Sequence, residues 1–309
     1  MALAPIVVFC YNRVAHLEKV IESLLANEEA ANSNLIIYSD GPKQEADKIA
    51  VAKIRAYLPH IRGFASLKII EQPVNMGLAA NIVMGVTAVV NQYGKIIVVE
   101  DDVILSPYFL SFMNDGLSRY ENNKEVACIC GYLYPVKKPV PAAFFIYGAD
   151  CCVWATWKDQ WEIYEPDGLK LWNKLQEKGA NWRFDFEGSY PYTKMLADQI
   201  KGRNNSWAVR WYASAFVLDR LTLYPGKSLV EDKGWDDTGV HCEATDAFDV
   251  ELHNEPISLD GIVVEHNQQA YQAFKDFFFT LHNWSRFKRF RKLFKLRLKY
   301  FLRLNKVPS

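Results

Sequence analysis

The sequence lacks several features that mark large protein classes. Its 309 residues hold six cysteines, none of which form a C-x-x-C pair or a set with zinc-finger spacing. No G-x-G-x-x-G follows the first predicted strand, and no G-x-x-x-x-G-K-S/T occurs anywhere. No run of about 18 uninterrupted apolar residues is present either. These absences count against a zinc finger, a dinucleotide-binding enzyme, a P-loop NTPase and a protein with a membrane-spanning helix.

The composition is that of a folded globular protein. Half of the residues are hydrophobic and 23% are charged, which excludes a disordered polypeptide, a collagen-like fibre and a coiled coil. The N-terminus is apolar without a basic region and continues directly into Tyr11-Asn12-Arg13, so we interpret it as a first strand and not as a signal peptide. Because we also expect the cysteines to be reduced thiols, the sequence predicts a cytoplasmic protein.

The charges are unevenly distributed along the chain. There are 36 basic and 36 acidic residues, and this zero balance counts against a nucleic-acid partner. From residue 284 onward, however, there are ten basic residues and no acidic one, which leaves 26 basic and 36 acidic residues before it. An acidic body with a basic tail indicates a partner such as a membrane surface.

The first hundred residues alternate between strand and helix patterns. The predicted strands are Ile6–Tyr11, Leu35–Ser39, Leu67–Glu71 and Lys95–Val99, and the predicted helices are Val14–Ala26, Glu45–Tyr57 and Leu78–Tyr93. The strands begin about 30 residues apart, which is the length of a βαβ unit. The pattern predicts an α/β fold with a mostly parallel sheet and helices on both faces. Ligands of such sheets bind beyond the carboxyl ends of the strands.

Three adjacent carboxylates follow the fourth predicted strand. Glu100, Asp101 and Asp102 come directly after a buried apolar run, where they would repel one another without a cation. Carboxylate oxygens suit Mg²⁺ or Mn²⁺, which also bridge phosphate oxygens. The other interpretation is a solvated turn and helix cap, because Ser106-Pro107 precedes a helix predicted to begin at Tyr108.

Several segments of the chain together resemble a known family. They are Phe9–Arg13, Tyr38–Gly41, Asn75–Leu78, Val99–Asp102, Trp154–Lys158, Asn205–Trp211 and Leu223–Val230. The combination is similar to nucleotide-sugar glycosyltransferases of the GT-A fold, in particular to the bacterial family-2-like sugar transferases. It is more distantly similar to the N-acetylglucosaminyltransferases of N-glycan branching. The resemblance covers about residues 5 to 245.

The resemblance implies a role for each matching residue. Asp102 would ligate the Mn²⁺ or Mg²⁺ ion that bridges the donor's phosphates, and Asp101 would contact the ribose or the donor sugar. Arg13 would pair with phosphate, unless it forms a surface salt bridge. Asp40 would accept a hydrogen bond from uracil in a UDP-sugar, unless it only forms the turn before Gly41.

Two further residues complete the expected donor site. Asn75 and Gly77 would line the donor pocket, where the glycine lets the backbone approach the ligand.

A sugar-1-phosphate nucleotidyltransferase is a less favoured alternative. Such an enzyme predicts a glycine-rich phosphate loop after the first strand, and Asn12–His16 contains no glycine.

The second half of the chain is rich in tryptophan but lacks an obvious catalytic base. Trp207 and Trp235 are the best candidates for sugar-stacking platforms, although aromatic side chains more often pack in cores. An inverting transferase needs a carboxylate base. The family often has Asp just before the Ser-Trp-Ala segment, but here that position is Asn205, an amide. This residue is the one feature that favours a non-catalytic glycan- or membrane-binding relative.

A polar, glycine-bounded segment after residue 233 offers substitutes for the base. Asp236 and Asp237 are the base candidates, in a segment that is either a loop closing over the donor phosphates or a plain surface loop. His241 is a candidate for a further metal ligand or phosphate contact, and His266 is a weaker one; a structural role is the alternative for each.

The C-terminal segment has the pattern of a basic amphipathic helix. Between residues 283 and 304, one narrow helix face is apolar and another is basic; the apolar face consists of Phe287, Phe290, Phe294, Leu298 and Phe301. Such a helix is typical of proteins that lie on an anionic membrane surface. Packing on the protein's own core, an oligomer contact and RNA binding are the alternatives.

These observations predict a metal-dependent glycosyltransferase. We expect a GT-A catalytic domain over residues 1–275, with a nucleotide-sugar-binding half (1–125) and an acceptor-binding half (126–275), followed by a basic amphipathic tail (276–309). The expected reaction is inverting transfer from a UDP-sugar to a glycan or lipid-linked glycan acceptor in bacterial surface polysaccharide synthesis. The expected location is the cytoplasmic face of the membrane.

Overall fold

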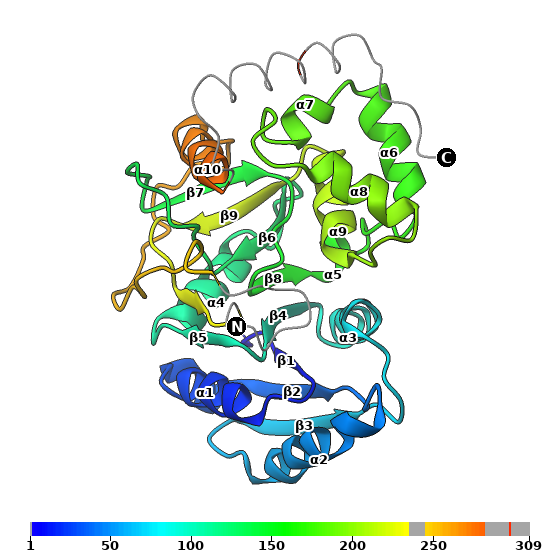
Figure 1. Cartoon of the computed structure of the whole chain (residues 1–309). Coiled ribbons are helices and arrows are strands. Elements are labelled where there is room, and N and C mark those ends of the chain that lie inside the picture. The colour runs from blue at the N-terminus through cyan, green and yellow to red at the C-terminus, as the bar shows by residue number, and fades with distance from the viewer. Residues whose placement is uncertain (1, 235–244, 282–296, 298–309) are drawn as a thin grey trace.

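The computed structural model describes residues 2–234, 245–281 and 297. Its centre is an eight-stranded sheet with the strand order β3-β2-β1-β4-β8-β6-β9-β7 (Figure 1). The strands of this sheet are β1 (Ile6–Cys10), β2 (Asn34–Ser39), β3 (Ser66–Glu71), β4 (Lys95–Glu100), β6 (Val126–Cys130), β7 (Ala143–Tyr147), β8 (Trp154–Trp157) and β9 (Leu221–Pro225). A small second sheet pairs β5 (Val103–Leu105) with β10 (Val230–Asp232).

The central sheet is mostly parallel. Strands β3, β2, β1 and β4 are parallel neighbours, and β6 is parallel to β9. Between these two groups lies β8, which is antiparallel to both β4 and β6, and β7 adds an antiparallel edge next to β9. The predicted α/β fold is thus confirmed, and β8 is the strand that joins the N-terminal group to the rest of the central sheet.

Helices pack on both faces of the sheet. They are α1 (Val14–Leu25), α2 (Lys48–Tyr57), α3 (Leu78–Tyr93), α4 (Phe109–Arg119), α5 (Lys158–Trp161), α6 (Gly168–Glu177), α7 (Asn181–Phe184), α8 (Tyr192–Ile200), α9 (Trp207–Phe216) and α10 (Gln268–Thr280), with 3₁₀ turns at Glu28–Asn32, Glu45–Asp47 and Leu58–His60. In β1, Ile6 and Val8 join the apolar cluster that contains α1, α2 and α4. Val7 and Phe9 join the cluster that contains α3. Successive side chains of this buried strand therefore point alternately into two apolar cores, one on each face of the sheet.

The predicted elements of the first hundred residues are found within one residue of their expected bounds, with one exception. Helix α3 has the predicted bounds, and glycines with positive φ stand at both ends, Gly77 at +74° and Gly94 at +78°. The exception is the helix expected over Glu45–Tyr57, whose first three residues form a 3₁₀ turn. Helix α4 begins at Phe109, one residue after the predicted start.

The second half of the chain adds a helical layer beside strands β6 to β9. Helices α6 to α9 follow one another between β8 and β9, and α10 packs near β7 (Figure 1). Helix α10 runs across residue 275, and its Phe274, Phe277 and Phe278 are buried in the larger core. In the described residues, no helix is long and apolar enough to cross a bilayer.

Candidate functional site

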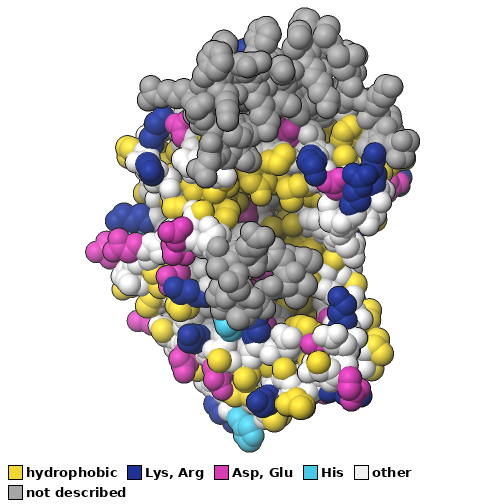
Figure 2. Space-filling model, in the orientation of Figure 1, with side chains coloured by type: hydrophobic (Ala, Val, Ile, Leu, Met, Phe, Trp, Pro, Cys, Tyr) yellow, Lys and Arg dark blue, Asp and Glu magenta, His cyan; other side chains and the backbone are white. Residues whose placement is uncertain are grey.

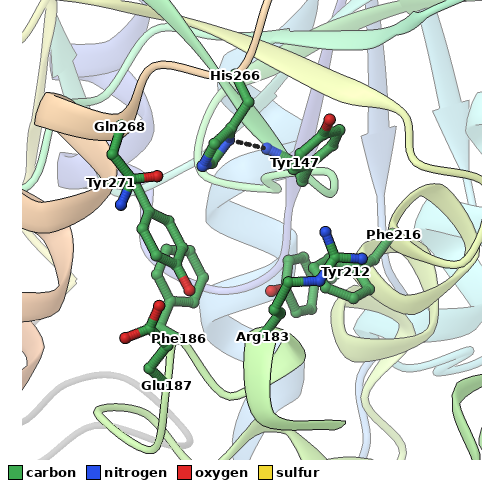
Figure 3. A pocket seen from close by; sticks show the side chains of 9 residues that line it. All are labelled: Tyr147, Arg183, Phe186, Glu187, Tyr212, Phe216, His266, Gln268 and Tyr271. Atoms are coloured by element: carbon green, nitrogen blue, oxygen red, sulfur yellow. Dashed lines mark hydrogen bonds between the residues drawn. The ribbon is translucent and has the colours of Figure 1, made fainter. Parts of the chain in front are cut away.

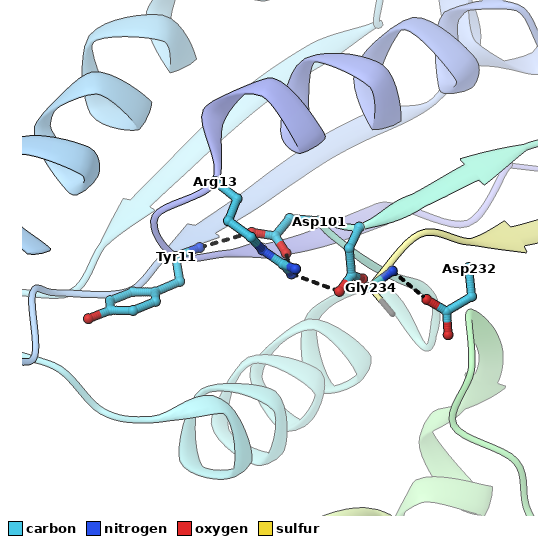
Figure 4. Close-up of polar contacts among 6 residues, drawn as sticks. Tyr11, Arg13, Asp101, Asp232 and Gly234 are labelled. Atoms are coloured by element: carbon cyan, nitrogen blue, oxygen red, sulfur yellow. Dashed lines mark hydrogen bonds and ion pairs between the residues drawn. The ribbon is translucent and has the colours of Figure 1, made fainter. Parts of the chain in front are cut away.

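The carboxyl ends of β1 and β4 bring an arginine and two aspartates together. Arg13 lies just before α1, and its Nη2 atom is 2.7 Å from Asp101 Oδ1 and 2.7 Å from Asp102 Oδ2. The backbone N–H of Tyr11 donates to Asp101 Oδ2 at 3.3 Å (Figure 4). In this structure Arg13 therefore bridges the two carboxylates, and its contact with a donor phosphate stays a prediction.

Burial makes this cluster electrostatically demanding. Burial raises the pKa of Asp101, although the neighbouring Arg13 cation opposes the shift. Burial and the charges of Asp102 and Asp101 raise the pKa of Glu100 to about 8. Arg13 Nη1 is buried and has no hydrogen-bond partner in the described part of the chain. The cluster thus holds more negative than positive charge, together with one unused guanidinium donor.

The small sheet adds a fourth carboxylate that the sequence did not suggest. Asp232 of β10 pairs in register with Val103 of β5, directly after Asp102. The Lys233 N–H donates to the Asp102 carbonyl at 2.7 Å, and the Gly234 N–H donates to Asp232 Oδ1 at 2.8 Å (Figure 4). Asp232 lies in the D-x-G of Asp232–Gly234, a weak signal that only the β5–β10 pairing makes meaningful.

Gly234 is placed between two of these carboxylates. A Cβ atom at this position would lie 2.5 Å from Asp102 Oδ2 and 3.2 Å from Asp232 Oδ1. A side chain here would therefore displace the carboxylate of Asp102. We call Arg13, Asp101, Asp102 and Asp232 the acidic edge.

The acidic edge fits a metal ion that shares its coordination with a ligand. Within the described residues, no group of three or more His, Cys, Asp or Glu side chains is arranged to hold a metal alone. Asp102, in the turn between β4 and β5, and Asp232 of β10 nevertheless both lie next to Gly234. Mg²⁺ is usually held by one or two carboxylates together with substrate phosphates rather than by a complete protein cage. The donor set therefore suits a metal–diphosphate better than a free ion.

Asp40 organises the loop that follows β3. Its carboxylate is buried and accepts four hydrogen bonds. Oδ1 accepts from the N–H groups of Gly41 and Met76, both at 2.8 Å, and Oδ2 accepts from the Gly77 N–H at 2.9 Å and from Asn75 Nδ2 at 3.1 Å. These bonds use about four lone-pair sites, which is the capacity of a carboxylate. Asp40, Asn75 and Gly77 are thus brought together as predicted, and the carboxylate holds the loop.

A second arginine, which the sequence analysis did not single out, ties the ends of β2 and β3 together. Arg55 Nη2 donates to the carbonyl of Gln72 at 2.7 Å and to that of Asp40 at 3.3 Å. Its Nη1 atom lies 3.5 Å from Glu71 Oε2. Arg55 projects from α2, where nothing in the helical pattern marks it as different from an exposed charge.

An aromatic cavity adjoins the acidic edge on the side of β8. Its volume is about 180 Å³. The lining includes Asp150 and Cys151 before β8 and Ala208 and Val209 in the first turn of α9, with aromatic rings around them; the rings are Tyr134, Tyr147, Phe186, Tyr190, Tyr192, Tyr212, Tyr224, Phe274 and Phe278. We call this the first cavity.

The register of the sheet places the first cavity beside the acidic edge. Trp154 of β8 pairs with Val98 of antiparallel β4, so the residues before β8 lie next to the end of β4. Burial, Asp150 and Glu100 all raise the pKa of the Cys151 thiol, in that order of effect. The intervening Val153 has a φ of +48°, a left-handed conformation that is strained for a β-branched residue.

A second cavity of about 150 Å³ lies beyond the first. It shares the rings of Tyr147, Phe186 and Tyr212 with the first cavity. In Figure 3, Gln268, Tyr271, Phe186 and Glu187 line one side, and Arg183, Tyr212 and Phe216 line the other, with His266 beside Tyr147. Hydrophobic side chains gather across the middle of the molecular face in Figure 2, between the two ends of the protein.

Part of the chain matches a known protein family. Residues 6–138 match the sequence model of glycosyl transferase family 2. The match includes Arg13, Asp101 and Asp102 but covers less than half of the chain. Over these residues the chain is similar to glycosyl transferase family 2, which supports the predicted enzyme class. The more distant likeness to the N-acetylglucosaminyltransferases stays a prediction.

Solved structures show weaker likenesses. Residues 1–349 of S. aureus TarS share 9% identity at a TM-score of 0.41, over 76% of this chain and 61% of that one. The mannosyltransferase PcManGT from Pyrobaculum calidifontis, in complex with GDP-Man and Mn²⁺, shares 13% identity at a TM-score of 0.30, over 44% of this chain and 36% of that one. The chain spans less than two thirds of either structure. Nothing about the donor or acceptor follows from likenesses of this strength. No curated protein sequence matches the chain.

Beyond the matched glycosyltransferase domain, the predicted residues have different outcomes. The prediction for Trp207 is wrong, because its ring is only 5% exposed and stacks on Trp154 at 5.7 Å between ring centroids, as part of the core. Asn205 is exposed, and its Oδ1 atom accepts from Arg210 Nη2 at 3.5 Å. His266 lies at the second cavity and not at the acidic edge.

Other predicted features lie outside the described residues. These include the base candidates Asp236 and Asp237, the metal-ligand candidate His241, and Trp235. Apart from residues 276–281 and 297, the amphipathic tail lies outside them too, so its association with an anionic membrane stays a prediction.

Proposed function

We propose that the protein is a metal-dependent glycosyltransferase that moves a sugar from a nucleotide diphosphate to a glycan acceptor. The observation that supports this most is the acidic edge, of which Arg13, Asp101 and Asp102 lie within the matched residues 6–138, and which adjoins an aromatic cavity. A carboxylate edge suits the diphosphate with its metal, and a ring-lined cavity suits the apolar face of a sugar.

The protein's own residues would prepare the site before the donor arrives. Arg13 holds Asp101 and Asp102 in place. Gly234 has no side chain, which leaves space next to the carboxylates of Asp102 and Asp232. Asp102, with Asp232, would hold Mn²⁺ or Mg²⁺, which supplies charge neutralisation for the departing diphosphate. The rings that line the first cavity would limit the access of water to the transferred sugar.

The donor we propose is a UDP-sugar. This proposal rests on the resemblance of the sequence motifs to those of nucleotide-sugar glycosyltransferases. The loop at Asn75–Gly77 would line the nucleotide pocket with its backbone, since Asp40 holds that backbone in place. We further propose inverting transfer with Asp236 or Asp237 as the base, in bacterial surface polysaccharide synthesis.

Asp102→Asn tests the metal-dependent mechanism. We expect sugar transfer and donor hydrolysis with Mn²⁺ to fall by about 100-fold or more, because the ion loses its charged ligand. Asp260→Asn is the control, because Asp260 is exposed and forms its ion pair with Arg119, away from the acidic edge. Before the kinetic assay, thermal stabilisation by UDP-, GDP- and dTDP-sugars with Mn²⁺ identifies the donor. Full transfer by Asp102→Asn without metal would refute the mechanism.

A non-catalytic glycan-binding relative is the second candidate. Asn205 favours it, because an amide stands where the family often has a carboxylate. This candidate predicts no turnover and no metal-dependent nucleotide binding in the wild-type protein, so the same donor screen separates the two functions.

A further inference from the structure

The two cavities are neighbouring compartments of one aromatic groove. Tyr147, Phe186 and Tyr212 line both of them, so the two compartments share these three rings. The first cavity adjoins the acidic edge through Asp150 and Cys151, and the second lies farther from it. A chain-like ligand that reacts at the acidic edge would therefore pass from the first compartment into the second.

The second cavity differs from the first in its polar lining. Arg183, Glu187, His266, Gln268 and Tyr271 all line it, between aromatic rings. Arg183 and Gln268 are exposed, so this compartment opens toward solvent. A lining of rings alone would suit an acyl chain, whereas rings interspersed with hydrogen-bonding groups suit a ligand with apolar faces and many hydroxyl groups.

One polar atom of this lining is buried and unused. Tyr271 is 8% exposed, and its hydroxyl has no hydrogen-bond partner in the described part of the chain. Buried hydroxyl groups in native proteins nearly always have a partner, and one without a partner calls for an explanation. A bound ligand at this cavity would supply it.

His266 presents a second donor to the same space. Its Nδ1 atom accepts from the backbone N–H of Tyr147 at 3.4 Å (Figure 3). Burial, with the Arg183 cation, lowers its pKa to about 4, so the ring is neutral at pH 7. In a neutral imidazole whose Nδ1 accepts, Nε2 carries the proton and is a donor.

The lining of the second cavity carries one cation, Arg183, and one anion, Glu187. Lys275 Nζ lies 2.5 Å from Glu187 Oε2, and Arg183 Nη2 lies 3.5 Å from Asp219 Oδ1, a carboxylate that it shares with Lys178. The two opposite charges of the lining leave hydrogen-bonding capacity, which suits a neutral ligand with many hydroxyl groups.

We propose that the second cavity is a subsite for the second sugar unit of a neutral glycan acceptor, and this rests on the proposed glycosyltransferase function. The first cavity would hold the sugar unit that receives the transfer, and Tyr147, Phe186 and Tyr212 would contact both units. The Tyr271 hydroxyl and His266 Nε2–H would bind hydroxyl groups of the second unit. The acceptor is accordingly a chain of at least two sugars.

Tyr271→Phe tests the subsite, and Tyr120→Phe is its matched control. The hydroxyl of Tyr120 is also buried without a partner in the described residues, but Tyr120 packs against Phe145 and lines neither cavity. Neither substitution removes a hydrogen bond present in the unliganded protein, so we expect both variants to unfold at temperatures close to the wild type.

The probes are immobilised mono- and disaccharides of glucose, galactose, mannose, rhamnose, N-acetylglucosamine and N-acetylgalactosamine, and the p-nitrophenyl glycosides of the bound sugars as acceptors. We expect the wild-type chain to bind at least one disaccharide more tightly than its monosaccharides. Tyr271→Phe should raise the disaccharide Kd and acceptor KM about fivefold to tenfold with kcat unchanged, and should leave the monosaccharide constants unchanged. Tyr120→Phe should change none of them.

Two results would overturn the subsite. One is the absence of any preference for disaccharides while donor binding is intact, and the other is an equal effect of Tyr271→Phe on mono- and disaccharides. Both leave the proposed glycosyltransferase function standing. Conversely, disaccharide binding that depends on Tyr271, without any sugar transfer, would support the subsite and refute the proposed function.

Discussion

Two buried aspartates, one in each half of the protein, organise their surroundings in different ways. Asp40 and Asp150 each accept four hydrogen bonds. Three of the donors to Asp40 are backbone N–H groups of nearby turns. Asp150 accepts from the N–H groups of Cys151 and Cys152 and from the hydroxyls of two tyrosines, Tyr224 at 2.9 Å and Tyr134 at 3.3 Å.

The difference teaches how the same kind of side chain builds two different surroundings. Near the acidic edge, a carboxylate fixes main-chain loops, and a short motif is enough to encode the arrangement. Around the first cavity, a carboxylate fixes side chains that come from β9 and from the loop between β6 and β7. The first arrangement suits a ligand part shared by many enzymes, such as a nucleotide diphosphate. The second suits a part that varies between enzymes, such as the acceptor.

The largest expected effect is that of Asp40→Ala. The substitution leaves the N–H groups of Gly41, Met76 and Gly77 without their acceptor, so the free energy of unfolding should fall by about 3 to 4 kcal/mol. Donor affinity should fall with it, because the Asn75–Gly77 loop loses its support. Urea unfolding and titration with the donor found in the thermal screen measure the two effects. Asp260→Ala is the control. If Asp40→Ala binds the donor as tightly as the wild type does, Asp40 does not support the donor site.

Asp150→Ala should lower the stability less than Asp40→Ala does, and it should impair binding of the acceptor rather than binding of the donor. We expect a loss of about 2 to 3 kcal/mol, because the hydroxyls of Tyr134 and Tyr224 can rotate toward other partners while the two N–H groups cannot. Hydrolysis of the donor should continue, whereas the KM for the acceptor should rise. If the donor KM rises instead, Asp150 supports the donor site, and the proposed division into a donor half and an acceptor half is wrong.

The smallest expected effect is on the pH dependence of stability through His266. Its pKa is about 4 in the folded protein, below the usual 6.5, because burial and Arg183 disfavour the charged ring. As the pH falls, the unfolded chain takes up this proton first. The stability contributed by the neutral ring is therefore complete above pH 6.5 and is lost as the pH falls toward 4.

Unfolding in urea at pH 7 and pH 4.5 measures this contribution. Since the ring is partly exposed, we expect the wild type to lose only about 1 to 2 kcal/mol more than His266→Gln over this interval. His60→Gln, at an exposed 3₁₀ turn, should behave like the wild type. Identical losses in all three proteins would show that the second cavity does not hold a neutral histidine.

The acidic edge could be predicted from the sequence because its residues follow strands of a regular βαβ pattern. Arg13, Asp101 and Asp102 each come after an apolar run, and parallel strands bring such positions to one edge. Asp232 could not be predicted in this way, because it arrives through the pairing of β10 with β5. No local pattern announces that pairing.

The aromatic half resisted prediction for a different reason. A tryptophan between polar residues, such as Trp207, has the same local pattern whether it faces a ligand or begins a buried helix, and here the packing against Trp154 decides for the core. Tyr271 and Arg183 are 88 positions apart in the chain and meet only at the cavity. Recognition sites of this kind become visible when the tertiary structure is known.

Strand β8 has a consequence for how such a protein can change over evolutionary time. It provides all the hydrogen bonds in the central sheet between the N-terminal strand group and the later strands. Its four residues are completely buried, so they are constrained by packing rather than by any ligand. Apart from β10, which brings Asp232 to the acidic edge, the segments beyond this strand can therefore change in length while the N-terminal strand group keeps its hydrogen-bond pattern. In the central sheet, one short strand thus connects two groups of strands that can vary separately.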